Sequence, residues 1–371
     1  MKTAEKKIRV LVVDDSAFMR KVLVAIIAGD PQMEVIGQAK DGREAVDLAE
    51  SLHPDVITMD INMPRMDGLQ ATELIMSANP RPIVIVSSES RAGADSTLRA
   101  LELGAIEFVP KPSSGIDLDM NKVGDELNRK LKMAAKVRVV RTATLSKIAR
   151  GAAKPQASGL SPANGGGIAA AAGGRFPIVV IAASTGGPAT VMRLVPSFPK
   201  GFPAAVFLVL HMPATFTTQF GVQLAQLSSL RVKEAESNEA IQPGTLYVCP
   251  GSHHLRISAT GKILLDDGPR ISGYRPCADV ALETLAAYAG KMAVGVVLTG
   301  MGNDGARGVK AVKSVGGTVI AQDEATAVIF GMPAEAIKTG AVDEVLGVDE
   351  IYPAIERRVL QLCRAVPVSV R

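Results

Sequence analysis

Two stretches decide the fold of this 371-residue chain: residues 9–15 read RVLVVDD, and residues 178–188 read IVVIAASTGGP. Each is a short apolar run that gives way abruptly to polar residues. Runs of this kind are typical of strands in a parallel sheet, because crossover helices cover both faces of such a sheet. Sites in open parallel sheets form at the carboxyl ends of strands, so Asp14, Asp15 and Ser184 are the first residues to consider.

Similar apolar runs alternate with amphipathic, helix-like stretches through both halves of the chain. The length exceeds what one hydrophobic core usually organises, so this rhythm predicts two α/β domains. The predicted strands are residues 9–13, 34–39, 56–59, 83–86 and 107–109 in the first half, and residues 178–182, 204–210, 245–249, 294–298 and 318–321 in the second.

The charge distribution marks a boundary between the two halves. Residues 127–233 contain 14 Lys or Arg and no Asp or Glu, and residues 151–175 are nearly all Gly, Ala, Ser and Pro. The second stretch cannot bury enough apolar surface to order itself, which predicts a flexible linker. The basic block is either a solvated tether or a surface that draws an acidic protein towards the second domain. We expect domains at 1–126 and 176–371, joined by a helical extension and linker at 127–175.

Composition excludes several classes of protein. The formal net charge of +4 is too mild for a typical nucleic-acid binder, and no apolar run approaches the roughly 18 residues of a membrane span. The first residues lead into too few apolar positions for a signal peptide. Cys249, Cys277 and Cys363 have no metal-ligand or disulfide spacing. These features predict a protein of the reducing cytoplasm.

Polar side chains converge at the strand ends of the first half. Asp14, Asp15 and Asp60 end two predicted strands, Ser87 ends another, and Lys111 follows the last. Clustered carboxylates repel one another unless a hard cation joins them, which predicts a Mg²⁺ site. Phosphoryl transfer to Asp60 needs such a cation together with the Lys111 charge. Routine helix capping explains any one of these residues but not all five.

Residues 8–125 resemble a two-component receiver domain, a (βα)5 fold, through the segment 59–64 (MDINMP) and the pair Lys111-Pro112. The resemblance implies that Asp15, Asp60 and the backbone of Asn62 bind Mg²⁺ with Asp14 assisting. It also implies that Ser87 senses the phosphoryl group, that Phe108 is the switch aromatic, and that a cis peptide bond precedes Pro112.

In the second half, Ser184 follows a predicted strand and precedes Gly-Gly-Pro, which places it on a tight, exposed turn. The segment lacks the lysine of a phosphate-binding loop, and Ala182 excludes the Gly-x-Ser-x-Gly elbow. Of the four histidines, His211 also follows a strand directly and is the best base. His53 is expected on the surface of the first domain, and His253 and His254 lie in a Pro-Gly turn in supporting or structural roles.

A base needs a carboxylate to orient it, and Asp304 lies in a glycine-rich loop after a third strand. The rival acids are weaker: residues 266–268 (DDG) suggest a hairpin turn, Asp279 starts a helix, and Asp323 follows the next strand in a supporting position. Three strand ends that supply Ser, His and Asp suit a catalytic triad, with backbone N–H groups left for an oxyanion hole. Three unrelated caps and turns remain the alternative.

Residues 176–360 resemble the catalytic domain of the CheB family of chemotaxis protein-glutamate methylesterases. The matching segments are 183–188 (ASTGGP), 210–213 (LHMP), 298–305 (LTGMGNDG), 275–276 (RP) with Asp279, and 331–333 (GMP). The resemblance implies a doubly wound, mostly parallel α/β domain with Ser184 as nucleophile, His211 as base and Asp304 as the orienting carboxylate. It places Thr185 and the Met301 N–H at the oxyanion. Cys277 departs from the serine common in relatives, which affects rate rather than chemistry.

The resemblance further implies that the protein demethylates glutamate methyl esters and deamidates glutamines on methyl-accepting chemoreceptors, after phosphorylation by a chemotaxis histidine kinase. The esterase reaction needs no cofactor, and Mg²⁺ serves the receiver domain. The alternatives are a generic serine esterase and a non-catalytic response regulator. The chain has no helix-turn-helix pattern or basic recognition helix, so DNA is not an expected partner.

Overall fold

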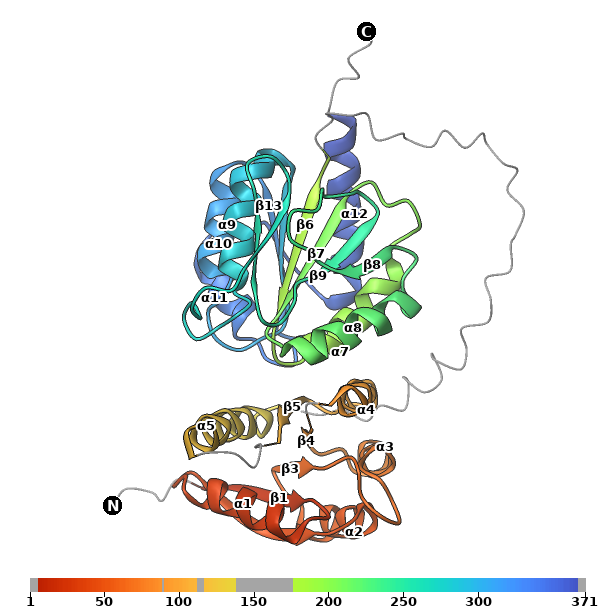
Figure 1. Cartoon of the computed structure of the whole chain (residues 1–371), viewed down its shortest axis with the longest axis vertical. Coiled ribbons are helices and arrows are strands. Elements are labelled where there is room, and N and C mark those ends of the chain that lie inside the picture. The colour runs from red at the N-terminus through yellow and green to blue at the C-terminus, as the bar shows by residue number, and fades with distance from the viewer. Residues whose placement is uncertain (1–5, 89, 112–116, 138–175, 366–371) are drawn as a thin grey trace, which may run out of the picture.

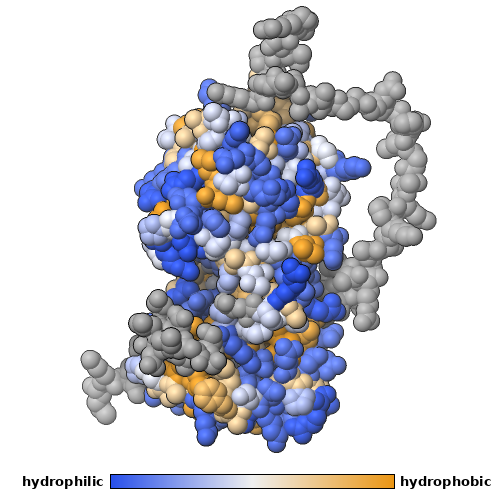
Figure 2. Space-filling view, viewed as in Figure 1, coloured by the Kyte–Doolittle hydropathy of each residue, from blue (hydrophilic) through white to orange (hydrophobic). Residues whose placement is uncertain are grey.

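A computed structural model describes residues 6–88, 90–111, 117–137 and 176–365. The described residues form two α/β halves that follow one another along the long axis of the molecule (Figure 1). Hydrophilic side chains cover much of the visible face of both halves (Figure 2). Among the described helices, none is both long enough and apolar enough to cross a bilayer. The predicted linker at 151–175, the end of the predicted helical extension and the peptide bond before Pro112 lie outside the described residues.

The N-terminal sheet has five parallel strands in the order β2-β1-β3-β4-β5. Side chains alternate along β1: Val10 and Val12 pack towards α1 and α5, while Leu11 and Val13 pack towards α2 to α4. The strands are β1 (Ile8–Val13), β2 (Met33–Ala39), β3 (Val56–Met59), β4 (Ile83–Ser87) and β5 (Glu107–Pro110). The helices are α1 (Ala17–Ala28), α2 (Gly42–Leu52), α3 (Gly68–Ala78), α4 (Arg91–Glu102) and α5 (Asp117–Ala134).

The C-terminal sheet has seven parallel strands in the order β14-β13-β12-β6-β7-β9-β8, and a separate antiparallel hairpin joins β10 to β11. Helices α9 to α11 cover one face, and α7, α8 and α12 cover the other. The strands are β6 (Ile178–Ala183), β7 (Ala205–Leu210), β8 (Arg231–Glu234), β9 (Thr245–Val248), β10 (His254–Ile257), β11 (Ile263–Asp266), β12 (Ala293–Val297), β13 (Thr318–Gln322) and β14 (Glu344–Leu346). The helices are α7 (Gly187–Leu194), α8 (Ala214–Leu227), α9 (Ala278–Ala289), α10 (Ala306–Ser314), α11 (Met332–Lys338) and α12 (Val348–Arg364), with 3-10 turns at Val195–Ser197 and Gly290–Met292.

The strand order reverses at β6, because the chain runs from β6 to β7 on one side and returns to β12 on the other. A parallel α/β sheet leaves a crevice at such a point, outside the carboxyl ends of its strands. The loops that follow β6, β7 and β12 carry Ser184, His211 and Asp304. The topology therefore delivers these three residues to one edge of the sheet.

All ten predicted strands are present, with boundaries within one residue of the expected ones. The predicted hairpin turn at 266–268 is wrong: Asp266 ends β11 and pairs with His254, and the chain reverses between Ser258 and Lys262. His254 accordingly begins β10 instead of lying in the preceding turn. Within the predicted helical extension and linker at 127–175, helix α5 ends at Ala134 in the described part of the chain.

Candidate active site

The loop after β6 holds Ser184 in a partly exposed turn. The Ser184 N–H donates to the carbonyl of Thr299, 3.0 Å away, which ties this turn to the loop after β12. Gly186 has φ of 75°, and a Cβ there would lie 2.4 Å from Val328 Cβ, so the turn requires glycine. Pro188 then lies in the first turn of α7. The local sequence therefore presents the Ser184 hydroxyl at the edge of the sheet.

His211 follows β7 and lies beside Ser184 in the register of the sheet, because the preceding residues Ala183 and Leu210 are paired across β6 and β7. His211 Nε2 lies 2.7 Å from Asp304 Oδ2. The other ring nitrogen, Nδ1, is buried and has no hydrogen-bond partner in the described part of the chain. Within the part of the chain that the structure describes, Ser184 Oγ makes no hydrogen bond to the imidazole. The imidazole thus bonds the carboxylate through one nitrogen and leaves the other unpaired.

Asp304 is buried and accepts hydrogen bonds on both carboxylate oxygens. Oδ2 accepts from the Ala278 N–H at 2.7 Å as well as from His211, and Oδ1 accepts from the Asp279 N–H at 2.9 Å. The Cys277 thiol lies 3.1 Å from Oδ1. Burial alone would raise the pKa of Asp304, but the His211 contact and the backbone N–H groups outweigh it and hold this pKa below its ordinary value. The carboxylate therefore stays ionised beside the imidazole.

Tyr274 is a further residue at this site, and no sequence pattern pointed to it. Its ring stacks on the His211 imidazole, with centroids 4.1 Å apart and planes 15° apart. The segment that carries it is held by hydrogen bonds between Arg275 Nη1 and the carbonyls of Asp267 and Gly268. The stacking restricts rotation of the imidazole out of its plane.

The two backbone N–H groups expected at an oxyanion belong to Thr185 and Met301. Neither has an acceptor recorded in the described part of the chain. Thr299 joins their loops: its hydroxyl donates to the Thr185 carbonyl at 2.9 Å, and its N–H donates to Oε1 of buried Gln322 at 2.8 Å. Gln322 is a second residue that strand patterning did not reveal, because it ends an otherwise apolar strand.

The carboxylate cluster of the N-terminal half forms at the ends of β1 and β3. Lys111 Nζ lies 2.8 Å from both Asp14 Oδ2 and Asp60 Oδ2. Asp14 and Asp60 are buried, whereas Asp15 is exposed, and one oxygen from each of the three lies within 4.8 Å of the others. Burial raises the pKa of Asp60, with a contribution from the Asp14 charge, against the lowering effect of Lys111. The cluster holds excess negative charge at a partly buried edge.

The other residues expected in the first domain differ in their burial and in their contacts. Ser87 is buried, and its hydroxyl donates to the Gly93 carbonyl at 3.3 Å. The side chain of Asn62 is exposed. Phe108 is buried and lies against the other half of the chain, where it stacks on Phe216 of α8. His53 caps α2 on the surface, as expected.

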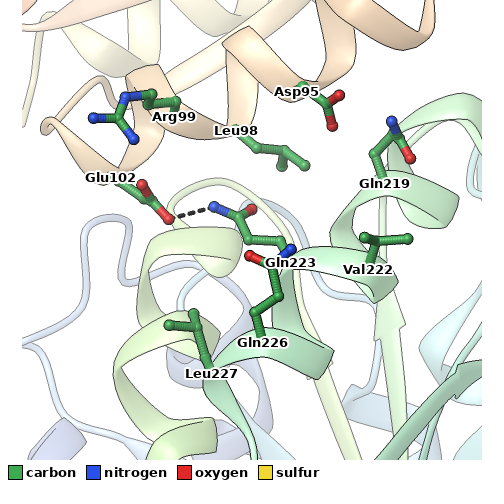
Figure 3. Close-up of a pocket in the computed structure, with 9 residues that line it drawn as sticks. All are labelled: Asp95, Leu98, Arg99, Glu102, Gln219, Val222, Gln223, Gln226 and Leu227. Atoms are coloured by element: carbon green, nitrogen blue, oxygen red, sulfur yellow. Dashed lines mark hydrogen bonds between the residues drawn. The ribbon is translucent and has the colours of Figure 1, made fainter.

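The two halves meet through α4, β5 and α5 on one side and α8 and the Met301 loop on the other. Arg129 Nη1 of α5 lies 2.8 Å from Met301 Sδ. At a separate place on the boundary, α4 and α8 line an open pocket of about 260 Å³ that includes Leu98 and Val222, and Glu102 accepts a hydrogen bond from Gln223 there (Figure 3). The N-terminal half therefore contacts the loop that carries one of the expected oxyanion groups.

Comparison with known proteins gives concordant results for both halves. A family model described as CheB methylesterase matches residues 179–355, and one described as response regulator receiver domain matches residues 10–121. The chain is 45% identical to the protein-glutamate methylesterase/protein-glutamine glutaminase of Pyrococcus abyssi, over 95% of this chain and 94% of that protein. It is 43% identical to the protein of the same name from Symbiobacterium thermophilum, over 96% and 98%. The crystal structure of the Thermotoga maritima CheB methylesterase catalytic domain covers 50% of this chain and 99% of its own, with 42% identity and a TM-score of 0.48.

Proposed function

The chain belongs to the CheB family of protein-glutamate methylesterases/protein-glutamine glutaminases, and we propose that Ser184, His211 and Asp304 carry out the family's hydrolysis. The observation that carries this assignment is the 2.7 Å contact between His211 Nε2 and Asp304, made beside Ser184 with Nδ1 left unpaired. An imidazole bonded in this way can accept a proton at its other nitrogen. The His211–Asp304 contact supports a role of His211 as the base for Ser184.

In the proposed reaction, Ser184 Oγ attacks the γ-carbonyl carbon of a methyl-esterified glutamate, and His211 Nδ1 takes the hydroxyl proton. Asp304 stabilises the resulting imidazolium. The imidazolium returns the proton to the departing methoxide, so methanol leaves and an acyl-serine remains. Water, deprotonated by His211, then cleaves the acyl-serine to give glutamate and restore Ser184. With a glutamine side chain the same steps release ammonia.

The N–H groups of Thr185 and Met301 are suited to the negative oxygen of the tetrahedral intermediate. Donors fixed before the reaction stabilise developing charge without reorganising at the moment of reaction. The bond from the Thr299 hydroxyl to the Thr185 carbonyl supports this role, because it joins the two loops, and the bond from the Thr299 N–H to Gln322 anchors Thr299 to β13.

Asp60 is the proposed phosphoacceptor of the receiver domain, with Asp14, Asp15 and the backbone of Asn62 as Mg²⁺ ligands. The donor set fits a hard cation, since three carboxylates offer oxygens within 4.8 Å of one another and burial disfavours the charge of Asp60. Bound Mg²⁺ would neutralise charge on the cluster and on a phosphoryl group. Lys111 would pair with a phosphoryl oxygen, and Ser87 lies at the end of β4 in position to respond to it.

We further propose that the unphosphorylated receiver domain restrains the esterase. Two contacts support this: the Phe108–Phe216 stack joins the receiver domain to α8, and the Arg129–Met301 contact joins it to the loop of an expected oxyanion group. Phosphorylation of Asp60 would weaken these contacts and raise activity. The rise is limited by the free energy with which phosphorylation favours the separated domains over the docked ones. Deletion of residues 1–150 should then raise basal esterase activity, and unchanged or lower activity would count against restraint.

The proposed partners are methyl-accepting chemoreceptors as substrates and a chemotaxis histidine kinase as phosphodonor, and the proposed place of the reaction is the cytoplasm. The identity of the substrate is tested with methylated receptor fragments. Wild-type protein should release methanol and convert the methylated glutamates to glutamates, as measured by mass spectrometry of the receptor peptides. A generic esterase would hydrolyse small esters equally well, which makes a small-ester assay the discriminating comparison.

The nucleophile is tested by Ser184→Ala beside Ser314→Ala, which removes an exposed hydroxyl of α10. Loss of the nucleophile should cost about 10⁴- to 10⁶-fold in turnover. The Ser314 variant should match wild type. Methanol release by Ser184→Ala at the wild-type rate would overturn the assignment and favour a different nucleophile, whereas absence of turnover in wild type would favour a non-catalytic regulator.

A further inference from the structure

Cys277 is a buried thiol that directly contacts the acid of the proposed triad. It precedes α9 at the N-cap position, yet its side chain makes no capping bond to the helix and lies 3.1 Å from Asp304 Oδ1. The two residues after it donate their N–H groups to the same carboxylate. Each oxygen of Asp304 therefore has one backbone donor from α9 and one side-chain partner, His211 on Oδ2 and Cys277 on Oδ1.

We propose that Cys277 is a positioning residue that sets the basicity of His211 through the hydrogen bond of its S–H to Asp304 Oδ1. This inference rests on the proposed function, because it assumes that His211 is the base of the reaction. It assigns to the thiol a role distinct from helix capping and from packing.

The protonation state of the thiol supports the direction of this bond. Burial, together with the nearby Asp304 charge, raises the pKa of Cys277 to about 12, so the group carries its proton at neutral pH. An ionised carboxylate can only accept, so a protonated thiol at 3.1 Å faces it as a donor. The raised pKa also makes the thiol a poor nucleophile, which argues against a covalent role for it.

The strength of this donor should determine how strongly Asp304 attracts a proton onto His211. A donor hydrogen placed against the carboxylate brings positive charge close to it, which weakens the attraction between Asp304 and the imidazolium. A thiol is a weak donor and a hydroxyl a stronger one. Serine at this position should therefore weaken the attraction of Asp304 for the imidazolium, and alanine, which donates nothing, should strengthen it.

Other charged groups face the same pair and must stay constant in the comparison. The charged groups are Asp279 and Glu283 in α9, Arg307 in α10 and Arg129 in α5, and the neutral phenol of Tyr274 lies over the imidazole. Substitution at position 277 changes none of these residues. A shift that appears on substitution can then be assigned to the bond between positions 277 and 304.

The test is the acid limb of kcat/KM against pH for the full-length chain, which reports the base in the free enzyme. The probe is methanol release from a methylated chemoreceptor fragment. Relative to wild type, Cys277→Ser should move the limb down and Cys277→Ala should move it up, each by about half a pH unit. Cys249→Ala is the matched control, since it truncates another fully buried thiol, whose S–H faces the carbonyls of Pro250 and His253 instead of Asp304. Its limb should match wild type.

Shifts of both Cys277 variants in the same direction, or no shift, would overturn the inference. If the alanine variant does not fold, the serine variant alone decides: an acid limb at lower pH supports the inference, and an unmoved limb overturns it. Ser184→Ala, measured in parallel, separates this outcome from failure of the proposed function. If Ser184→Ala loses turnover while the acid limbs of the Cys277 variants do not move, only the role of the thiol is rejected. If Ser184→Ala retains turnover, the triad itself is rejected.

Discussion

Phe108 of β5 and Phe216 of α8 stack across the boundary between the two halves of the chain, with ring centroids 4.3 Å apart and planes 25° apart. Both rings are buried, and Lys130 of α5 lies over the Phe108 ring, with Nζ 5.1 Å from its centroid. The aromatic residue expected to respond to phosphorylation is therefore itself part of the contact with the esterase half. A change of its rotamer would act on that contact without an intermediate element.

Phe108→Ala should raise basal methylesterase activity in the absence of phosphorylation. Removal of an aromatic pair forfeits about 1 kcal/mol beyond the buried area, which corresponds to roughly a fivefold shift in the docking equilibrium. The measurement is methanol release by unphosphorylated full-length protein. Phe18→Ala, which removes an exposed ring from α1, should leave basal activity unchanged. Equal basal activity in both variants would argue that the stack does not restrain the enzyme.

Tyr274→Ala should lower kcat/KM, because the His211 imidazole loses the ring that stacks on it. An aromatic stack contributes about 1 kcal/mol, so a loss of roughly five- to tenfold is expected. Tyr274→Phe keeps the stack and should stay within about twofold of wild type, as measured by steady-state kinetics. A large defect in the phenylalanine variant would instead assign the function to the phenolic hydroxyl.

Asp304→Asn should reduce turnover by on the order of 10³- to 10⁴-fold, because an amide holds the wrong imidazole tautomer and cannot stabilise the imidazolium. Two backbone N–H groups and the Cys277 thiol also face this position, so an amide N–H₂ there meets donors instead of acceptors. Kinetics should be measured together with thermal unfolding. A variant that is as stable as wild type and equally active would remove Asp304 from the mechanism.

The sequence predicted much of the fold, because parallel strands are wholly apolar and end in polar residues. The strands it missed are short and lie at sheet edges or in the hairpin: β8 reads RVKE and β14 reads EVL, with no apolar run. The predicted turn at 266–268 was misplaced because a DDG segment resembles a hairpin turn, whereas the actual reversal passes through Gly261, whose φ is 76°.

Contacts between side chains from different segments could not be predicted from the sequence. Tyr274 lies in a segment without periodicity, and only the folded chain brings it to His211. The Phe108–Phe216 stack joins the two halves, and no local pattern specifies such a pair. The roles of Ser184 and its expected partners therefore remain predictions that depend on kinetics.

Asp60→Asn should stabilise the receiver domain at neutral pH while it abolishes phosphorylation. Burial raises the pKa of Asp60 above the value it has in the unfolded chain. The stability contributed by its protonated form is therefore fully present below the ordinary pKa and is lost as the pH rises through the raised one. Asparagine does not titrate, so the variant should be more stable than wild type at pH 7 and lose that advantage towards pH 4.

The same variant tests the proposed Mg²⁺ site. Mg²⁺ should stabilise the wild-type protein against urea, by about 2.7 kcal/mol at a concentration 100 times the dissociation constant, because it binds the folded cluster. Asp60→Asn removes one of the three carboxylates and should reduce this gain, whereas Asp47→Asn, on the exposed face of α2, should retain it. Equal stabilisation of both variants by Mg²⁺ would mean that the cation binds elsewhere, because loss of a ligand oxygen from a hard-cation site must weaken it.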